Sequence, residues 1–522
     1  MTYKTRFTAL AASVGIVALA GACKPDLNIT NPNAPDVARA VATPGDVRNL
    51  IGNSFNTWYL SMQGNAEPVP GLAVAVMADN MSMSFGNFGA RFNGQEPRLA
   101  YNNSSSNADG RVASSPYDGL YGALGAANDG LSAIARGVKV AQTAGATDET
   151  PQFTALAHLV QGLTLGFEAL VFDRGFVLDE TTPSGGATLQ AYTAVNDAAL
   201  VKLDKAIADA NGQSWTLANT FTPGMTLTAA QMGRFANTMA ARQIAYLPRT
   251  AAEAATTNWG KVLAYAEKGI SSNGTAPLTL QVTGDGGSVW YDVLKYYGES
   301  QSWVRTDMRV IQLMDPSQPL EYGSVTPPPK ATSADARLAS DFTFTNNIPF
   351  NPARGVYFFS QWSHTRYFFH SFESESEGLI GNVPFVLPAE NDLLIAEALV
   401  RTHGDKGRAA DLINRTRVTR GQLAPVSAAN TDNELLAAIF YERDIELMDT
   451  GAGQAWFDRR RIEPGLVYEG NPIGNPWAFK GGSNLQLGTP RHLPLPAKEL
   501  ETLGMPVYTY GGAPPNPVFG EK

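Results

Sequence analysis

Apolar residues recur at helical spacing through much of the C-terminal half of the chain. Between residues 391 and 461, three successive segments carry an apolar residue every three or four positions, which is typical of one face of an α-helix. Gly404 and Asp405 separate the first two segments, because glycine ends helices and aspartate caps them. The stretch from Thr431 to Glu434 has the form of a capping box and predicts the start of the third helix. Antiparallel helix pairs cannot bury their apolar faces alone, so the pattern predicts a stack of pairs.

The same periodicity appears earlier in the chain. Helical segments are predicted at residues 117–138, 152–172, 191–210, 232–249 and 258–270. Together with the C-terminal helices they predict three or four helix pairs and a mainly α fold. A first helix is expected to start near Pro44 and to reach Trp58, and another is expected to run through Met77–Met81.

Two regions lack long helical patterns. Residues 271–388 contain a glycine-rich stretch at 284–287, three consecutive prolines at 327–329 and the densest aromatic clusters of the chain. Residues 63–116 are rich in glycine, asparagine and serine. Loops of this length in a compact protein often carry function.

Composition narrows the class of protein. The chain has 522 residues, of which 44% are hydrophobic, enough for a large core. Its net charge is −9 and it has no basic cluster, which argues against nucleic acid as a partner. It has one cysteine, which excludes a disulfide framework and a cysteine-based metal site.

The N-terminus has the features of a secretory signal. Lys4 and Arg6 precede a short apolar run, and small residues lead up to the single cysteine, Cys23. The sequence before Cys23 resembles a lipobox, although Ala20 stands where leucine is usual. We therefore predict a lipoprotein signal peptide over residues 1–22, acylation of Cys23 and a polar tether over residues 23–44. The alternative is ordinary cleavage near Ala22, which would leave Cys23 as a free thiol.

Motifs of catalysis and of cofactor binding are absent from the sequence. It contains no GxSxG, GxxxxGK[ST], GxGxxG or HExxH pattern. Among its five histidines, His364 and His370 stand six residues apart in an aromatic stretch, where a polar role in a loop is favoured over metal ligation. We predict no cofactor and no metal.

Glu442 and Glu446 are the one pair of acids that could suggest glycoside hydrolysis. They lie one helical turn apart, so they share a face and point the same way. Glycosidases need two carboxyl groups that flank the scissile bond. Ion pairs that pack one helix against another are the favoured interpretation.

Three segments carry a resemblance to a known family. NDLLIAEALVRTHGDKGRAADLINRTR, YERDIELMDTGAGQAWFDRRR and HLPLPAKEL, in this order, resemble the SusD/RagB family of nutrient-binding outer-membrane lipoproteins. The resemblance implies a mainly α, tetratricopeptide-like helix-pair scaffold in a SusD-like domain over residues 45–522. The implied parts are a scaffold at about 117–270 and 389–461, a loop-rich insert at about 271–388, and an irregular C-terminal region at 462–522. Asp307-Met308-Arg309 and Asp335-Ala336-Arg337 resemble a D-x-R element of the family, which we interpret as structural.

The resemblance also implies a function. The protein would be anchored to the outer membrane through Cys23, facing the cell surface, and would capture an oligosaccharide. It would deliver this ligand to a SusC-like TonB-dependent transporter as a lid, without catalysis. Two alternatives remain: a lipoprotein of the same family that binds a peptide or another polymer, and a glycan hydrolase with acids from distant loops.

A sugar site needs an exposed aromatic ring for the C–H face and polar side chains for the hydroxyls. The regions 85–101 and 290–303 supply this mixture, although most of their aromatics are individually expected in the core. No residue matches a fixed binding motif. The candidate ligand-binding residues are Trp290, Tyr291, Tyr296, Trp303, Phe85, Arg91 and Asn93.

Overall fold

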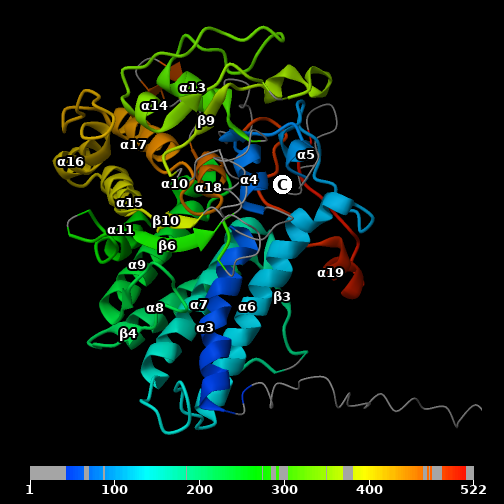
Figure 1. Cartoon of the computed structure of the whole chain (residues 1–522), viewed down its shortest axis with the longest axis vertical. Helices are drawn as coiled ribbons and strands as arrows, with labels where there is room; N and C mark the ends of the chain where they lie inside the picture. Colours follow the sequence, from blue (N-terminus) through cyan, green and yellow to red (C-terminus); the bar gives the residue numbers. More distant parts are fainter. Residues whose placement is uncertain are drawn as a thin grey trace, which may run out of the picture.

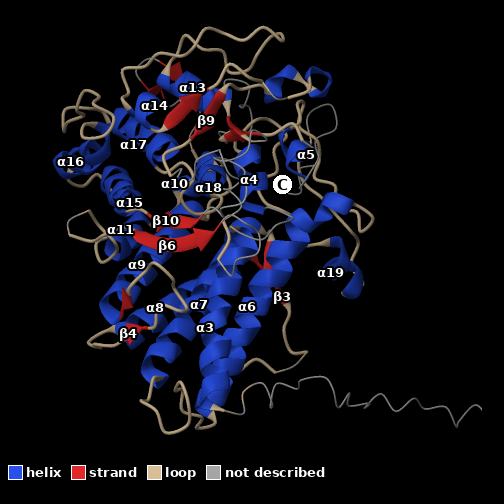
Figure 2. Cartoon of the chain, in the orientation of Figure 1, coloured by secondary structure: helices blue, strands red, loops and turns tan. Residues whose placement is uncertain are grey.

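The fold is built mainly of α-helices, with short two-stranded β-sheets between them (Figure 2). The structure is a computed structural model of the whole chain. The residues it describes are 41, 43–63, 70–85, 89–183, 185–272, 274–283, 290–292, 304–348, 350–367, 380–462, 467–468, 471–472 and 485–512. Cys23, Tyr296 and Trp303 lie outside these residues, as do the signal peptide and most of the tether.

The helices of the first half, with one short 3-10 helix, are α3 (Pro44–Met62), α4 (Pro70–Met77), α5 (Ala90–Gly94), η2 (Ala108–Gly110), α6 (Arg111–Ala135), α7 (Thr150–Val171), α8 (Tyr192–Ala210), α9 (Ala229–Tyr246), α10 (Ala251–Ala255) and α11 (Trp259–Ala266). Those of the second half are α13 (Met308–Met314), α14 (Arg337–Ser340), η4 (Pro352–Arg354), η5 (Val356–Phe358), α15 (Pro388–Arg401), α16 (Lys406–Arg417), α17 (Asp432–Glu446), α18 (Gln454–Arg459) and α19 (Ala497–Thr502). The mainly α fold predicted from the sequence is confirmed.

The long helices pack as a stack. Each helix from α6 to α9 packs on the next, α3 covers α6 and α7, and α11 bridges α9 and α15 (Figure 1). The stack continues with α15 against α16 and α17. This arrangement buries the apolar stripe of each helix against its neighbours, as the helical periodicity predicts.

Local capping signals define several helix starts. Thr431 and Glu434 form the predicted capping box, with the Glu434 amide donating to the Thr431 hydroxyl at 3.3 Å. Asp405 caps α16 by accepting from the Arg408 amide at 3.0 Å. Both interactions satisfy amides that have no partner inside the helix.

Within the part of the chain that the structure describes, α7 alone is long and apolar enough to span a membrane. Of its most apolar window, 89% is buried inside the protein. Its neighbours α3, α6, α8 and α9 enclose it, so α7 is placed as the central helix of the core.

The strands pair as antiparallel ribbons: β1 (Met81–Ser82) with β7 (Arg305–Thr306), β2 (Arg174–Phe176) with β3 (Leu189–Ala191), β4 (Thr216–Leu217) with β5 (Leu227–Thr228), β6 (Leu278–Thr283) with β10 (Ile380–Val386), β8 (Phe342–Phe344) with β9 (Trp362–His364), and β11 (Val467–Tyr468) with β12 (Asn471–Pro472). The β6–β10 ribbon joins the two ends of the 271–388 region, so that α13, α14 and the β8–β9 ribbon lie together beyond it (Figure 1).

The helix predicted across Met77–Met81 is wrong. Helix α4 ends at Met77, Asp79 has a left-handed backbone with φ of 51°, and Met81 begins β1. The left-handed residue cannot continue a right-handed helix, so the chain turns there and pairs with β7.

The C-terminal segment 485–512 returns to the N-terminal loops. Ala100 pairs with Gly511 in an isolated antiparallel bridge, and the Tyr101 amide donates to the Tyr510 carbonyl at 2.9 Å. The Asn103 amide group donates to the Leu495 carbonyl at 2.8 Å. These bonds fix the loop around residues 98–110 against a segment almost 400 residues later in the chain.

Candidate functional site

A pocket of about 200 Å³ opens between α5, the loop that follows it and the C-terminal segment. In Figure 1, α5 lies on the same side of the molecule as α19. We call this hollow the α5 pocket. The residues that line it are Gly89, Phe92, Asn93, Leu99, Ala100, Tyr101, Asn102, Asn107, Asp109 and Pro490.

Two glycines allow α5 to pack where it does. Gly89 has a left-handed backbone with φ of 69°, and a Cβ there would lie 2.9 Å from the Asp109 Cβ. A Cβ on Gly94 would lie 2.5 Å from Val76 of α4. Since glycine has no side chain, α5 approaches η2 at one end and α4 at the other more closely than any other residue would allow.

Arg98 joins three segments next to the pocket. It is buried, and its Nη1 donates to the Asn93 carbonyl at 3.2 Å while Nη2 donates to the Asp79 carboxylate. Its Nε donates to the Thr489 hydroxyl at 3.1 Å. A planar guanidinium with five donors suits this role, and it ties α5 to the turn after α4 and to the C-terminal segment.

The loop that carries Arg98 also holds a buried carboxyl group. Burial raises the pKa of Glu96 to about 8; Arg98 opposes this rise, and the charges of Asp79 and Glu321 add to it. Glu96 is therefore mostly protonated at neutral pH, which limits the negative charge buried behind the pocket wall.

The mouth of the α5 pocket combines an exposed ring with unused polar groups. Phe92 is 44% exposed, and the Arg91 guanidinium lies 5.5 Å from its ring centroid. The Asn102 side chain accepts from the Ser104 amide, which leaves its own amide hydrogens available. The Asp109 carboxylate accepts no hydrogen bond within the described ranges. An aromatic face beside a free acceptor and free donors can hold a ring that has one C–H face and a rim of hydroxyls.

The pocket does not present the acid pair of a glycosidase. Asp109 is the only carboxylic acid among the described lining residues, whereas hydrolysis of a glycosidic bond ordinarily uses two. Among the described residues, no three histidine, cysteine, aspartate or glutamate side chains come together as ligands for a metal ion.

Of the candidate residues predicted from the sequence, Asn93 lines the α5 pocket and Arg91 stands beside it. Asn93 donates to the Gly89 carbonyl at 3.3 Å, which stabilises α5. Phe85 is half-buried, packs edge-on against Phe350 at 6.2 Å and does not line the pocket.

Trp290 and Tyr291 require a correction. They are only 5% and 4% exposed, and the Trp290 ring lies 5.2 Å from Tyr59 and 6.0 Å from Phe55 of α3. The Trp290 ring covers an aromatic face of α3, and Tyr291 next to it is buried as well. Both residues therefore belong to the core and offer no open platform.

Asn93 is the one candidate among the described lining residues, and the other nine are not singled out from the sequence, including Phe92, Leu99, Asn102 and Asp109. The long polar region over residues 63–116 is a signal for this loop as a whole. Exposure of Phe92 and Leu99, at 44% and 49%, depends on how α5 packs and has no local sequence pattern.

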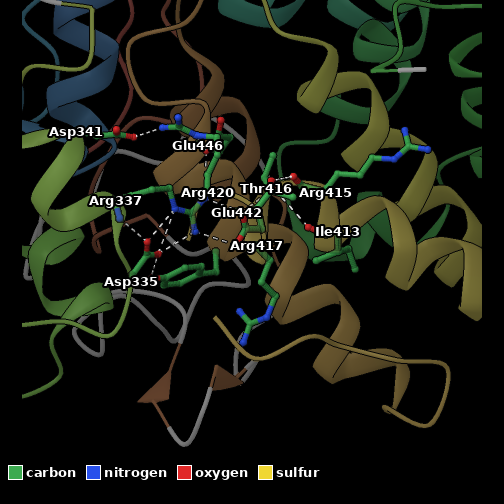
Figure 3. Close-up of polar contacts among 12 residues, drawn as sticks. Asp335, Arg337, Asp341, Ile413, Arg415, Thr416, Arg417, Arg420, Glu442 and Glu446 are labelled. Atoms are coloured by element: carbon green, nitrogen blue, oxygen red, sulfur yellow. Dashed lines mark hydrogen bonds and ion pairs between the residues drawn. The ribbon is translucent and has the colours of Figure 1, made fainter. Parts of the chain in front are cut away.

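Glu442 and Glu446 lie in a buried charge network and form the ion pairs predicted for them (Figure 3). Arg337 donates to the two Glu442 oxygens at 2.7 and 3.0 Å and to Glu446 at 3.3 Å. Glu442 also accepts from the Thr416 hydroxyl at 2.7 Å. Glu442 is fully buried and both its oxygens accept hydrogen bonds. These acids therefore hold α17 against its neighbouring elements.

Both D-x-R elements dock on α17. Arg337 pairs with Asp335 and Glu442, and Arg309 donates to both oxygens of Asp444 at 2.9 and 3.0 Å. Burial lowers the pKa of Arg337, but Glu442 and Asp335 raise it more, so its pKa lies above the usual range and the side chain stays charged.

His364 is also placed as a structural residue. It is buried, its Nδ1 lies 2.7 Å from the Asp449 carboxylate, and its ring packs against Phe342 at 5.1 Å. His370 lies outside the described residues.

The fold of this chain resembles that of several solved structures. No protein-family model matches the chain, and no curated protein matches it. Solved structures do match. A SusD superfamily protein from Parabacteroides distasonis has a TM-score of 0.60 at 11% identity, over 87% of this chain and 96% of the other.

Two further structures agree with this match. Surface glycan-binding protein A from Bacteroides uniformis has a TM-score of 0.58 at 14% identity, over 87% of this chain and 97% of that one. A SusD-like carbohydrate-binding protein from Bacteroides vulgatus has a TM-score of 0.56 at 14% identity, over 82% and 85% of the two chains.

The structure of this chain defines the class first: it is a mainly α protein with packed helices and short β-ribbons. Within that class, the fold of this chain is the SusD-like fold. The fold implied by the sequence resemblance is thereby confirmed.

Proposed function

We propose that this protein binds a glycan in the α5 pocket and does not cleave it. The observation that carries the proposal is the exposed Phe92 ring beside the free Asp109 carboxylate and the Asn102 amide. Two of the matching structures are described as carbohydrate-binding or glycan-binding proteins, which supports the same ligand class.

The test is titration calorimetry of the purified mature protein against a panel of neutral oligosaccharides. Phe92→Ala should weaken binding about fivefold, because stacking on an aromatic ring contributes on the order of 1 kcal/mol and about 1.4 kcal/mol corresponds to a factor of ten. Val201→Ala on α8, which removes another exposed apolar side chain (55%), should leave affinity unchanged.

Two outcomes would contradict the proposal. New reducing ends after incubation with the glycans would show hydrolysis. Binding of peptides but of no glycan would favour the alternative of a peptide-binding lipoprotein with the same fold.

The proposal extends to the setting of the protein. We place it on the outer membrane, facing the cell surface, anchored through an acylated Cys23 and covering a SusC-like TonB-dependent transporter that receives the glycan. The lipobox-like sequence and the SusD-like fold support this placement. Affinity purification from gently solubilised native membranes should recover the protein with a large TonB-dependent barrel, and recovery without one would contradict the lid role.

A further inference from the structure

A second and larger hollow, of about 800 Å³, lies beside the start of α9. In Figure 1, α9 and β6 lie away from α5, so this hollow is separate from the α5 pocket. We call it the α9 groove. The residues that line it are Gly224, Met225, Thr226, Gln231, Arg234, Ile270, Gly274, Thr275, Ala276, Pro277, Leu278, Thr279 and Asn382.

Three segments that are distant in sequence form the walls of the α9 groove. One wall is the turn before β5 and the first turns of α9, the second is the chain from Ile270 to Thr279, and the third is Asn382 of β10. The β6–β10 ribbon places Asn382 opposite Gln281. A capping box at Thr228 and Gln231 fixes the start of α9, so these walls rest on regular structure.

The floor of the groove is apolar and its rim donates hydrogen bonds. Met225, Ile270 and Leu278 are buried. Gln231 uses its carbonyl oxygen to accept from Thr228 in the capping box, at 2.9 Å, so its amide nitrogen faces no competing partner within the described ranges. The Asn382 amide and the Thr226 hydroxyl likewise make no hydrogen bond within these ranges.

Arg234 is the only charged residue among the described lining residues of the groove. It is exposed and forms no ion pair with any residue that the structure describes. In a chain of net charge −9, most arginines that the structure describes pair with acids, as Arg337 and Arg309 do. A cation left without an acid in a donor-rich groove favours a ligand that brings its own carboxylate.

We propose that the α9 groove binds a saccharide that carries a carboxylate, such as a uronic acid oligomer, with the carboxylate on Arg234. The inference rests on the proposed glycan-binding function and adds a second subsite with its own ligand class. A volume of about 800 Å³ is within the range of pockets that enclose ligands of a few rings, and it far exceeds the space of a free small anion. The amides of Gln231 and Asn382 and the apolar floor would then contact hydroxyls and ring carbons.

The test compares trigalacturonate with its fully methyl-esterified form, which has the same rings and no charge. We expect the wild-type protein to bind trigalacturonate at least tenfold more tightly than the ester, measured by calorimetry at physiological salt. Arg234→Gln should remove this preference, and Asn382→Ala should weaken binding of both forms. Arg136→Gln, which removes an exposed arginine at the end of α6, is the matched charge control and should change nothing.

Each contrary result overturns the inference. Arg234 would not bind the ligand carboxylate if the protein bound the acid and the ester equally well or did not bind trigalacturonate. The same would follow if Arg234→Gln bound the acid and the ester as the wild-type protein does. Displacement by acetate at equal carboxylate concentration would indicate an unspecific anion site, and equally tight, Arg234-dependent binding of trialanine would indicate a peptide carboxylate.

The proposals for the α5 pocket and the α9 groove can be tested independently. Phe92→Ala reports on the α5 pocket and should not change the preference for trigalacturonate over its ester. If neutral glycans do not bind but the Arg234 dependence persists, the proposed function of the α5 pocket fails and the α9 groove stands.

Discussion

The Arg337 guanidinium lies across both carboxylate oxygens of Glu442, at 2.7 and 3.0 Å, and neither side chain has any measurable exposure (Figure 3). The two residues are 105 positions apart in the chain. One belongs to a D-x-R element of the 271–388 region and the other to α17. This pair therefore fastens the loop-rich insert to the helical scaffold.

Arg337→Ala should destabilise the protein by about 3–5 kcal/mol, because it leaves the buried carboxylates of Glu442 and Asp335 without their cation. Urea unfolding followed by circular dichroism measures the loss. The control is Arg408→Ala, which breaks an ion pair with Glu267 whose side chains are 45% and 37% exposed. That variant should lose less than about 1 kcal/mol, and equal losses in the two variants would contradict the structural role of the Arg337 pair.

Glu168 should make the protein less stable as pH rises. This side chain of α7 is 2% exposed, neither of its oxygens has a hydrogen-bond partner within the described part of the chain, and burial raises its pKa well above the ordinary value, with the Asp118 charge adding to the rise. The folded state therefore keeps a proton that the unfolded state releases above a pKa of about 4.3. The protonated Glu168 carboxyl group contributes fully to stability below the unfolded pKa. This contribution is lost as pH rises through the folded pKa.

Glu168→Gln removes this loss. The free energy of unfolding of the variant, relative to the wild-type protein, should increase as pH rises above the unfolded pKa of about 4.3. Glu501→Gln, an equal charge change at an exposed position, is the control. Parallel pH profiles for Glu168→Gln and the wild-type protein would show that Glu168 is ionised in the folded state.

Lys202 should have the opposite dependence on pH. Its buried ammonium lies 3.1 Å from both Asp179 and Glu180. Partial burial raises the pKa of Glu180, but hydrogen bonds from Gln161 and Lys202 lower it to about 2. Because the folded pKa is below the unfolded one, the stabilisation is present above about pH 4.3 and is lost as pH falls towards 2.

Lys202→Met should cost about 2–3 kcal/mol at neutral pH and flatten the loss of stability between pH 4.5 and 2.5. Lys205→Met is the matched control, since Lys205 is 44% exposed and lies 3.6 Å from Glu180. Thermal unfolding across this pH range measures both. If Lys202→Met loses stability between pH 4.5 and 2.5 as the wild-type protein does, Lys202 does not stabilise the ionised forms of Asp179 and Glu180.

The sequence predicts the helices well because their signals are local. The capping residues Asp405 and Thr431 act within three positions of themselves, and α15, α16 and α17 begin close to where their patterns start. An apolar stripe needs only neighbours three or four residues away to be recognised. The same holds for α7, whose apolar positions indicate a core helix.

Long-range pairing is where prediction from sequence fails. Nothing near Glu442 indicates that its partner is Arg337, and nothing in the aromatic cluster of the insert indicates that Trp290 lies against α3. The α5 pocket depends on contacts between residues 89–109 and a segment at 490. Such contacts come from tertiary packing, to which periodicity and motif spacing are insensitive.

The anchor prediction can be tested through the thiol, because Cys23 is the only cysteine of the chain. In an acylated protein the wild-type chain should enter the detergent phase of a Triton X-114 extraction and resist maleimide labelling. Cys23→Ser should move to the aqueous phase, since several acyl chains are needed for stable membrane attachment. A wild-type protein that labels with maleimide would support ordinary cleavage near Ala22 instead.

Gly89 should control the shape of the α5 pocket. Gly89→Ala adds a methyl group 2.9 Å from the Asp109 Cβ and strains a backbone with φ of 69°. We expect it to displace Asp109 and to weaken glycan binding about tenfold, the effect of losing about 1.4 kcal/mol.

Gly212→Ala is a close control, because Gly212 has φ of 71° and open space around its Cβ position. Both variants should lose about 1–2 kcal/mol of stability from the left-handed backbone, but only Gly89→Ala should lose affinity. Equal affinities would mean that the ligand does not contact the wall formed by α5 and η2, and the glycan site would have to lie elsewhere on the molecule.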